Sequence, residues 1–579
     1  MFDKDSGTSL KELFFPLTNK KAIWIIIIIG AFVYFTSLFN GFVGDDASQI
    51  VNNPLVHSYK NIPNFFSGST FYLGTSEQLY GHYYKPILSL YYSLVYSIFG
   101  PNFSAFHFFQ IIFHIVNASL LFLLFTRFFD KSKAFFLSIV FLVHPINSEA
   151  VFYISAAQDT LFFLFGIVAL LLATKKIINT QILVLVTFFL LFSLLSKETG
   201  FLFVATIIIY PLIFKRHYFY HLLTASLIAS AIYFFLRINA IKFLSIPGNS
   251  PIAKLDLWER LINVPEIIFF YVKTFFFPVN LAISYNWVHR EISFSHFFFP
   301  LLVVLLFIST IIFFAFLLYK QPTRKYFKES IFFLVWFIIG ILLHIQFFPL
   351  DATVADRWFY FPIVGLLGMI GLVLSAFKLK LSKTWIIIVV VIILLILSVR
   401  TIVRSYDWRD VWTLYSRDIT VSKDNYVLES GIADYLLNQG KYNEAKVHAE
   451  NSVNIYPFFN NYTTLGTIYH RLGDYKKSKE AYLNALKYGD FYITYENLAV
   501  LALAYGDPEE NIIFVKDALR KYPQNAKLWL SLAILEYKNN QIEDAKTTIS
   551  TLYRFNKSAI VIHYYDIIIN GEPLNEEFK

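Results

Sequence analysis

Long apolar runs separated by short polar stretches fill the first two thirds of the chain, up to about residue 399. A helix needs about 20 apolar residues to cross a bilayer. Several runs approach this length, so the pattern predicts an all-α fold built on a polytopic bundle of about 11 membrane spans. We place the spans at residues 22–40, 104–126, 134–143, 157–173, 181–195, 201–214, 218–236, 297–318, 330–347, 358–377 and 384–399.

A further apolar stretch, residues 261–283, contains Glu266, Lys273 and Pro278, and we interpret it as an interfacial or re-entrant segment. Short loops rich in Lys and Arg face the cytoplasm by the positive-inside rule. The basic loops, including 320–328, fall on one side only if this stretch does not cross.

The same rule predicts a cytoplasmic N-terminus in the inner or plasma membrane. The first span follows Lys20-Lys21 and lacks a small-residue cleavage site, so we expect it to be retained. A long outer loop, 41–103, follows it, and the C-terminal part of the chain lies on the outer side.

The pattern changes at residue 426, where charged residues become common and the periodicity becomes that of paired amphipathic helices. Short similar stretches begin at Gly440, Gly473, Gly506 and Asn540, at spacings of 33, 33 and 34 residues. This period resembles the tetratricopeptide repeat. We therefore expect a membrane domain at 1–405, a linker at 406–425, and a helical solenoid at 426–579 with four repeats and a capping helix.

Composition supports a membrane protein, because 56% of residues are hydrophobic and 15% are charged, against about 25% charged in soluble domains. The net charge of +9 lies largely in the loops that set topology, so we expect membrane lipid and no nucleic acid as a partner. The chain has no cysteine, which excludes disulfides, thiol nucleophiles and cysteine metal sites.

Two adjacent carboxylates, Asp45 and Asp46, follow the first span directly. A Gly-Asp-Asp triplet can be a simple turn. A carboxylate at the membrane surface can also act as a general base on a hydroxyl group. We interpret the pair as catalytic and favour Asp45 as the base.

Other charged and polar residues are predicted at the outer ends of spans. The cations could reach lipid headgroups, but together they suit recognition of a phosphate leaving group; they are Lys85, Lys197, Arg237 and Arg357. A further set is expected to contact the sugar or to support these residues: Tyr84, His144, Glu149, Asp159, Glu198 and Asp356. No metal-ligand motif is present, so no metal site is predicted, although a divalent cation could join the acidic pair.

An ordered set of motifs runs through the chain: Phe42 to Asp46, Asn52-Asn53-Pro54, Tyr84-Lys85-Pro86, His107 to Asn117, His144-Pro145, Glu149-Ala150-Val151, Asp159, Lys197-Glu198, Tyr271-Val272-Lys273, Phe277-Pro278 and Asp356 to Pro362. This set resembles the GT-C superfamily of polytopic glycosyltransferases, and most closely the type that joins a membrane domain to tetratricopeptide repeats (TMTC-like protein O-mannosyltransferases and their prokaryotic relatives). The chain departs from this pattern at Gln158, where relatives often have Arg, and at Asp356, where they often have Glu.

The resemblance implies an inverting transferase that takes a sugar from a polyprenyl-phosphate donor. The acceptor would be a protein hydroxyl on the non-cytoplasmic face, held by the groove of the repeats. Two alternatives remain. The chain could be a glycolipid or polysaccharide transferase, or an oligosaccharyltransferase, with the repeats as a scaffold. It could also be a membrane-anchored repeat scaffold without activity.

Overall fold

The computed structural model describes residues 17–72, 79–80, 83–241, 250–320, 326–377 and 382–574. The chain divides into two compact units, with the boundary between Ser422 and Lys423. We call them the membrane unit and the repeat unit, and each is described by itself. Much of two basic loops that define the predicted topology, residues 321–325 and 378–381, lies outside the described residues.

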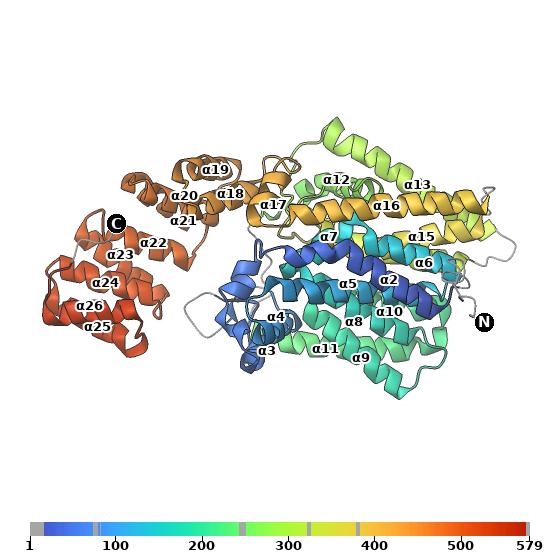
Figure 1. The fold of residues 1–579 in the computed structure, drawn as a ribbon, viewed down its shortest axis with the longest axis horizontal. Coiled ribbons are helices and arrows are strands. Elements are labelled where there is room, and N and C mark those ends of the chain that lie inside the picture. The colour runs from blue at the N-terminus through green and yellow to red at the C-terminus, as the bar shows by residue number, and fades with distance from the viewer. Residues whose placement is uncertain are drawn as a thin grey trace, which may run out of the picture. The chain divides into compact units, whose positions relative to one another are not determined.

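The membrane unit is a bundle of helices (Figure 1). Its helices are α2 (Asn19–Tyr34), α3 (Ile62–Ser67), α4 (Pro86–Phe99), α5 (Phe103–Phe125), α6 (Lys131–Val143), α7 (Ser148–Phe152), α8 (Ala157–Ala173), α9 (Thr180–Ser196), α10 (Phe201–Phe214), α11 (Phe219–Ala240), α12 (Leu257–Phe276), α13 (Phe299–Lys320), α14 (Phe327–Leu342), α15 (Pro362–Ala376), α16 (Lys383–Asp407) and α17 (Val411–Asp418). The segment between α3 and α4 also contains a short antiparallel pair of strands, β1 (Phe71–Tyr72) and β2 (Leu79–Tyr80).

Each of the eleven predicted spans coincides largely with a helix, and the chain is a multi-pass membrane protein. Among the described residues, six helices are long and apolar enough to cross a bilayer, and a seventh is obtained if α6 and the bent segment after it count as one span. They contain α2, α5, α8, α11, α13 and α16. The other four predicted spans, α9, α10, α14 and α15, are shorter, and a helix of 16 residues is about 24 Å long against a hydrocarbon core of about 30 Å. The total of eleven crossings therefore stays a prediction.

Most of the segment 261–283 lies in α12, which ends at Phe276 and is not among the candidate spans. The side chain of Asp256 caps its first turn by accepting from the backbone N–H of Glu259, whose carboxylate accepts from the backbone of Asp256 in return. This capping box satisfies donors at the helix start that would otherwise be unpaired.

A buried polar network fixes the interior of the bundle. The Tyr34 hydroxyl of α2 donates to the carbonyl of Leu142 (2.8 Å), and the His114 ring of α5 lies 2.7 Å from the hydroxyl of Tyr360. The amide of Asn117 donates to the same Tyr360 oxygen (3.1 Å). Buried polar groups need such partners, so this network holds the short 3₁₀ helix η11 (Asp356–Tyr360), which carries Arg357, against the core.

The end of the membrane unit is also fixed by a buried contact. Both guanidinium nitrogens Nη1 and Nη2 of Arg404, on α16, donate to the carboxylate of Asp418 at the end of α17, at 2.6 and 2.9 Å. The backbone N–H of Ile283 donates to Asp418 as well (2.7 Å). The predicted linker, 406–425, therefore contains the end of α16 and all of α17, and these belong to the membrane unit.

The repeat unit is a succession of helix pairs followed by a single helix (Figure 1). In each pair, the turn between the two helices contains one residue of positive φ, and these are Gly440, Gly473, Gly506 and Asn540. The pairs are α18 (Tyr426–Asn438) with α19 (Tyr442–Ile455), α20 (Phe459–Arg471) with α21 (Tyr475–Tyr488), α22 (Tyr492–Ala502) with α23 (Pro508–Lys521), and α24 (Ala526–Lys538) with α25 (Ile542–Phe555), and α26 (Ala559–Asn570) is the last helix.

Candidate active site

The segment between α2 and the next helical turn forms a tight loop, Gly41 to Asp46. Gly44 has a φ of +53°, and a Cβ atom there would lie 2.9 Å from the hydroxyl of Tyr153. Only glycine adopts this conformation without strain and leaves room for the tyrosine. The Tyr153 hydroxyl in turn accepts from the backbone N–H of Asp45 (2.9 Å), so the loop is packed against the connection between α7 and α8.

Asp46 fastens this loop to the bundle. One carboxylate oxygen accepts from the backbone N–H of Val43 (3.0 Å). The other accepts from the backbone N–H (2.8 Å) and the hydroxyl (2.6 Å) of Ser155. Asp46 is fully buried, and burial raises its pKa to about 7 although these three donors favour the ionised form. Its geometry is that of a residue that positions the loop.

Asp45 has a different environment. Its side chain is exposed to solvent, but protein groups lie close around it. Burial among these groups raises its pKa, and the positive charges of Arg357 and Lys85 oppose that rise. The carboxylate of Asp351 is close enough to raise the pKa further. Asp45 is thus an accessible carboxylate that faces two of the four predicted phosphate-binding cations.

The predicted cations come from four different elements, and three of them pair with predicted acids. Lys197, which follows α9, donates to Asp159 on α8 (2.6 Å). Arg237 on α11 donates to Glu198 (2.6 Å). Arg357 forms an ion pair with Glu149 on α7, and its backbone N–H also donates to that carboxylate (2.9 Å).

Lys85, directly before α4, differs from the other three cations because no carboxylate of a described residue lies within ion-pair distance of it. Its ammonium group lies 4.2 Å from the centre of the Tyr83 ring. Burial lowers its pKa, the charge of Lys197 lowers it further, and the charges of Glu198, Asp351 and Asp159 oppose this. These mutual effects show that Lys85, Lys197, Glu198 and Asp159 gather in one charged cluster beside Asp45.

Three other predicted residues are buried beside these ion pairs. The buried Tyr84 hydroxyl donates to the carbonyl of Phe66 (3.0 Å). The His144 ring stacks on Phe275 of α12 and lies 3.0 Å from its carbonyl oxygen. Asp356 is fully buried, and burial followed by the charge of Glu149 raises its pKa well above the ordinary value.

Sequence reasoning missed Tyr153, Ser155 and Asp351. Tyr153 and Ser155 hold the loop of Asp45 and Asp46, and Asp351 accepts from the hydroxyl of Tyr83 (3.2 Å). A signal was present, because Tyr153 and Ser155 lie between the Glu149 motif and Asp159, and Asp351 lies five residues before Asp356.

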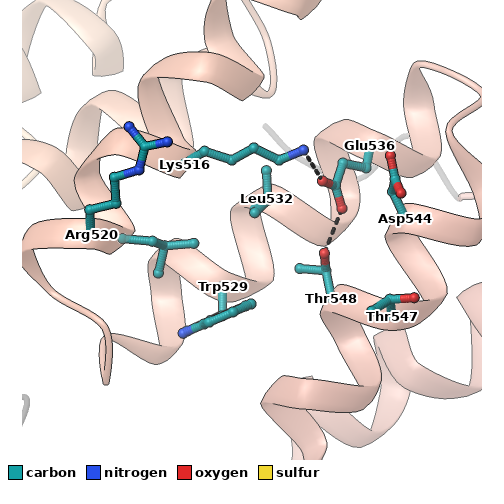
Figure 2. A pocket seen from close by; sticks show the side chains of 9 residues that line it. Lys516, Arg520, Trp529, Leu532, Glu536, Asp544, Thr547 and Thr548 are labelled. Carbon is teal, nitrogen blue, oxygen red and sulfur yellow. Dashed lines mark hydrogen bonds and ion pairs between the residues drawn. The ribbon is translucent and has the colours of Figure 1, made fainter.

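The repeat unit contains several pockets, and two of them differ in which helices line them. Figure 2 shows one of about 390 Å³ between α23, α24 and α25, where Lys516 (2.9 Å) and Thr548 (2.6 Å) both contact the carboxylate of Glu536. A second, of about 430 Å³, is lined by α22, α24 and α26 and includes Asn497, Asn525 and Lys527. The second pocket lies on the first helices of successive pairs, which makes it the better candidate for the predicted groove.

Comparison with known proteins finds similar sequences and one similar solved structure. The model of the family described as dolichyl-phosphate-mannose-protein mannosyltransferase matches residues 85–238. The protein O-mannosyl-transferase F38B6.6 of Caenorhabditis elegans is 25% identical over 455 residues, covering 75% of this chain and 63% of that protein. The protein O-mannosyl-transferase TMTC3 of Homo sapiens is 26% identical over 512 residues, covering 81% and 55%.

A solved structure, ArnT from Cupriavidus metallidurans bound to undecaprenyl phosphate, is 14% identical with a TM-score of 0.39, covering 80% of this chain and 79% of that one. The chain spans a little over half the length of the curated relatives it matches. The family match, residues 85–238, includes Lys85, Lys197 and Arg237. The chain is therefore similar in sequence to protein O-mannosyl-transferases over 75% to 81% of its length, and residues 85–238 also match the mannosyltransferase family model.

Proposed function

We propose that this protein is a membrane glycosyltransferase that moves a sugar from a polyprenyl-phosphate-linked donor to a Ser or Thr hydroxyl of a protein. The observation that carries the proposal is the contrast within the acidic pair. Asp46 is buried and occupied by three donors, whereas Asp45 is accessible and faces Arg357 and Lys85. The relatives named as protein O-mannosyl-transferases support the choice of reaction.

In the proposed reaction Asp45 accepts the proton of the acceptor hydroxyl. The hydroxyl oxygen then forms a bond to the anomeric carbon of the sugar, on the side opposite the phosphate. The bond between that carbon and the phosphate oxygen breaks, and the electron pair leaves with the polyprenyl phosphate. One displacement of this kind inverts the anomeric configuration.

The cations stabilise the charge that develops on the departing phosphate, which is a large source of rate enhancement when the groups are already in place. Lys85 suits this role because it has no carboxylate partner among the described residues, and Arg357 suits it because it also faces Asp45. Lys197 and Arg237 extend the cluster, and their partners Asp159 and Glu198 hold them in position. The buried Tyr84 and His144 support these groups by packing, and the buried Asp356 belongs to the same supporting set.

The repeat unit provides the acceptor-binding surface in this proposal. It is a tetratricopeptide solenoid whose groove is the pocket on α22, α24 and α26, where Asn497 and Asn525 offer amide groups to an extended peptide. The active site and the repeats face the outer side of the membrane, with the N-terminus in the cytoplasm.

The test is transfer of radiolabelled sugar from a polyprenyl-phosphate donor to protein in membranes that contain Asp45→Asn. Loss of a general base lowers a rate by about 10²- to 10⁴-fold, and the same loss is expected here. Asp130→Asn, at the exposed start of α6, is the matched control and should transfer at the normal rate. Transfer by Asp45→Asn at the rate of the unchanged protein would remove Asp45 from the reaction.

A further inference from the structure

Three potential metal ligands meet where the chain passes from α12 to α13, a region that the proposed reaction does not use. Glu266 lies on α12, His289 in the segment that follows, and His296 in the helical turn before α13. The Glu266 atom Oε2 lies 3.0 Å from Nε2 of His289 and 3.3 Å from Nδ1 of His296. One ligand atom from each residue lies within 4.8 Å of the other two.

Local contacts hold these side chains in place. His289 is fixed to α12 by two reciprocal bonds with Asn263, one turn before Glu266: its N–H donates to the Asn263 oxygen, and the Asn263 amide donates to its carbonyl, both at 2.8 Å. The backbone N–H of His296 donates to the hydroxyl of Ser293 (3.2 Å). The two imidazole rings are stacked with centres 3.8 Å apart. The arrangement is therefore built by the fold rather than by long flexible side chains.

The two imidazole nitrogens lie as close to the Glu266 carboxylate as ligands of one metal ion would, but neither donates a hydrogen bond to it. Its Oε2 atom is buried, and no described residue donates a hydrogen bond to it, although both imidazole nitrogens are within 3.3 Å. Ligand atoms around a tetrahedral ion with bonds of about 2.0–2.2 Å lie about 3.3–3.6 Å apart. Close approach without donation is expected where nitrogen lone pairs face a shared ion instead of the oxygen.

The chemistry of the donor set selects the ion. Two imidazoles and one carboxylate suit Zn²⁺ and its first-row neighbours, whereas Ca²⁺ and Mg²⁺ prefer oxygen ligands throughout. The fourth position would be open to water, because the His296 side chain is 45% exposed. We propose that Glu266, His289 and His296 bind one divalent transition-metal ion, with zinc as the expected ion.

This ion would fasten the segment 285–296 to α12. The same segment pairs with residues near η11: the carbonyl of Tyr285 accepts from the N–H of Thr353 (3.0 Å), and the Thr353 hydroxyl donates to the carbonyl of Trp287 (2.6 Å). Because Thr353 lies four residues before Arg357, the ion has a structural role in holding that part of the chain. The inference does not depend on the proposed reaction.

The test is zinc binding by the full-length protein in detergent, with any affinity tag removed and bound metals first stripped with a chelator. After addition of zinc chloride and gel filtration, inductively coupled plasma mass spectrometry should find about one zinc ion per chain. Competition with a coloured chelator then gives the affinity. His296→Asn and Glu266→Gln should each weaken binding by a factor of about 10 or more.

Glu291→Gln is the matched control, because Glu291 is an exposed acid on the same segment and is not part of the cluster. It should bind zinc as the unchanged protein does. Thermal unfolding separates ligand loss from misfolding: zinc should raise the melting temperature of the unchanged protein and of Glu291→Gln, but not that of His296→Asn. The proposal would be overturned if the unchanged protein bound no zinc. It would also be overturned if His296→Asn and Glu266→Gln bound zinc as tightly as the unchanged protein, and the cluster would then be an ion pair between Glu266 and the histidines.

Discussion

Asp45 and Asp46 have the same side chain and adjacent positions, and the fold gives them different partners. Asp46 is enclosed because Ser155, more than 100 residues later, supplies two donors to one of its oxygens. Asp45 points away from these donors and remains accessible. The sequence indicated the pair, but it could not distinguish the two, because the distinguishing contacts come from a distant segment.

A substitution at Asp46 should therefore lower the stability of the fold, and lower it more than the same substitution at Asp45. In Asp46→Asn the amide group cannot accept from the N–H of Val43 and from both donors of Ser155 together, so at least one buried donor loses its partner. An unsatisfied buried polar group costs about 1–3 kcal/mol. Thermal unfolding in detergent should show a lower midpoint for Asp46→Asn than for Asp45→Asn; equal midpoints would contradict the positioning role.

The pH dependence of transfer follows from the raised pKa of Asp45. A general base acts in its ionised form, so the rate should be low at acid pH and rise as Asp45 loses its proton. Because burial raises this pKa, the rise should be centred above the ordinary carboxyl value of about 4. Initial rates measured between pH 4 and 8 check this, and the residual activity of Asp45→Asn should lack the rise. A rate in the unchanged protein that does not vary with pH would argue against this assignment.

At the scale of elements, the turn residues of the repeat unit show why its periodicity was readable. Each helix pair turns at a residue of positive φ, which is glycine in three pairs and asparagine in the fourth. Glycine is strongly favoured where a helix ends in the left-handed conformation, and asparagine is the next choice. A backbone requirement repeated every 33 or 34 residues thus leaves a direct trace in the sequence.

Replacement of one of these glycines should loosen its own helix pair. At Gly473, where φ is +80°, alanine meets no atom within 4 Å, so the cost is conformational, about 1–2 kcal/mol. Hydrogen exchange of α20 and α21 in the full-length protein should be faster in Gly473→Ala. Asn540→Gly places glycine at the matching turn of the fourth pair, where φ is also positive, and should not speed exchange in α24 and α25.

At the scale of the whole molecule, periodicity and Lys/Arg distribution were sufficient to predict an all-α membrane protein with a helical C-terminal part. The ends of helices were harder to predict. The helix α16 continues past the predicted end at 399 to Asp407, because Asp418 neutralises the charge of Arg404 within the unit. The pairing of charges in the candidate site could not be predicted, since Glu149 and Arg357 are 208 residues apart.

The division of the chain near residue 422 gives a prediction for the whole protein. A chain ending at Ser422 retains every described contact of the loop, the charged cluster and the Arg404–Asp418 pair, so the membrane unit should still fold and bind the lipid donor. Transfer to protein should fall sharply because the acceptor-binding surface is lost. Normal transfer to protein by the shortened chain would show that the repeats do not hold the acceptor.

The acids that pair with three of the cations have a consequence for turnover. In the proposed reaction the donor is a phosphodiester with a charge of about −1, and the departing lipid is a phosphate monoester with about −1.5 to −2. The product would therefore be held by the cations more strongly than the substrate. Glu149, Asp159 and Glu198 compete for the same cations. Their competition speeds release of the polyprenyl phosphate. Neutralising one of these acids would therefore slow the steady-state rate of transfer more than the rate of the first turnover.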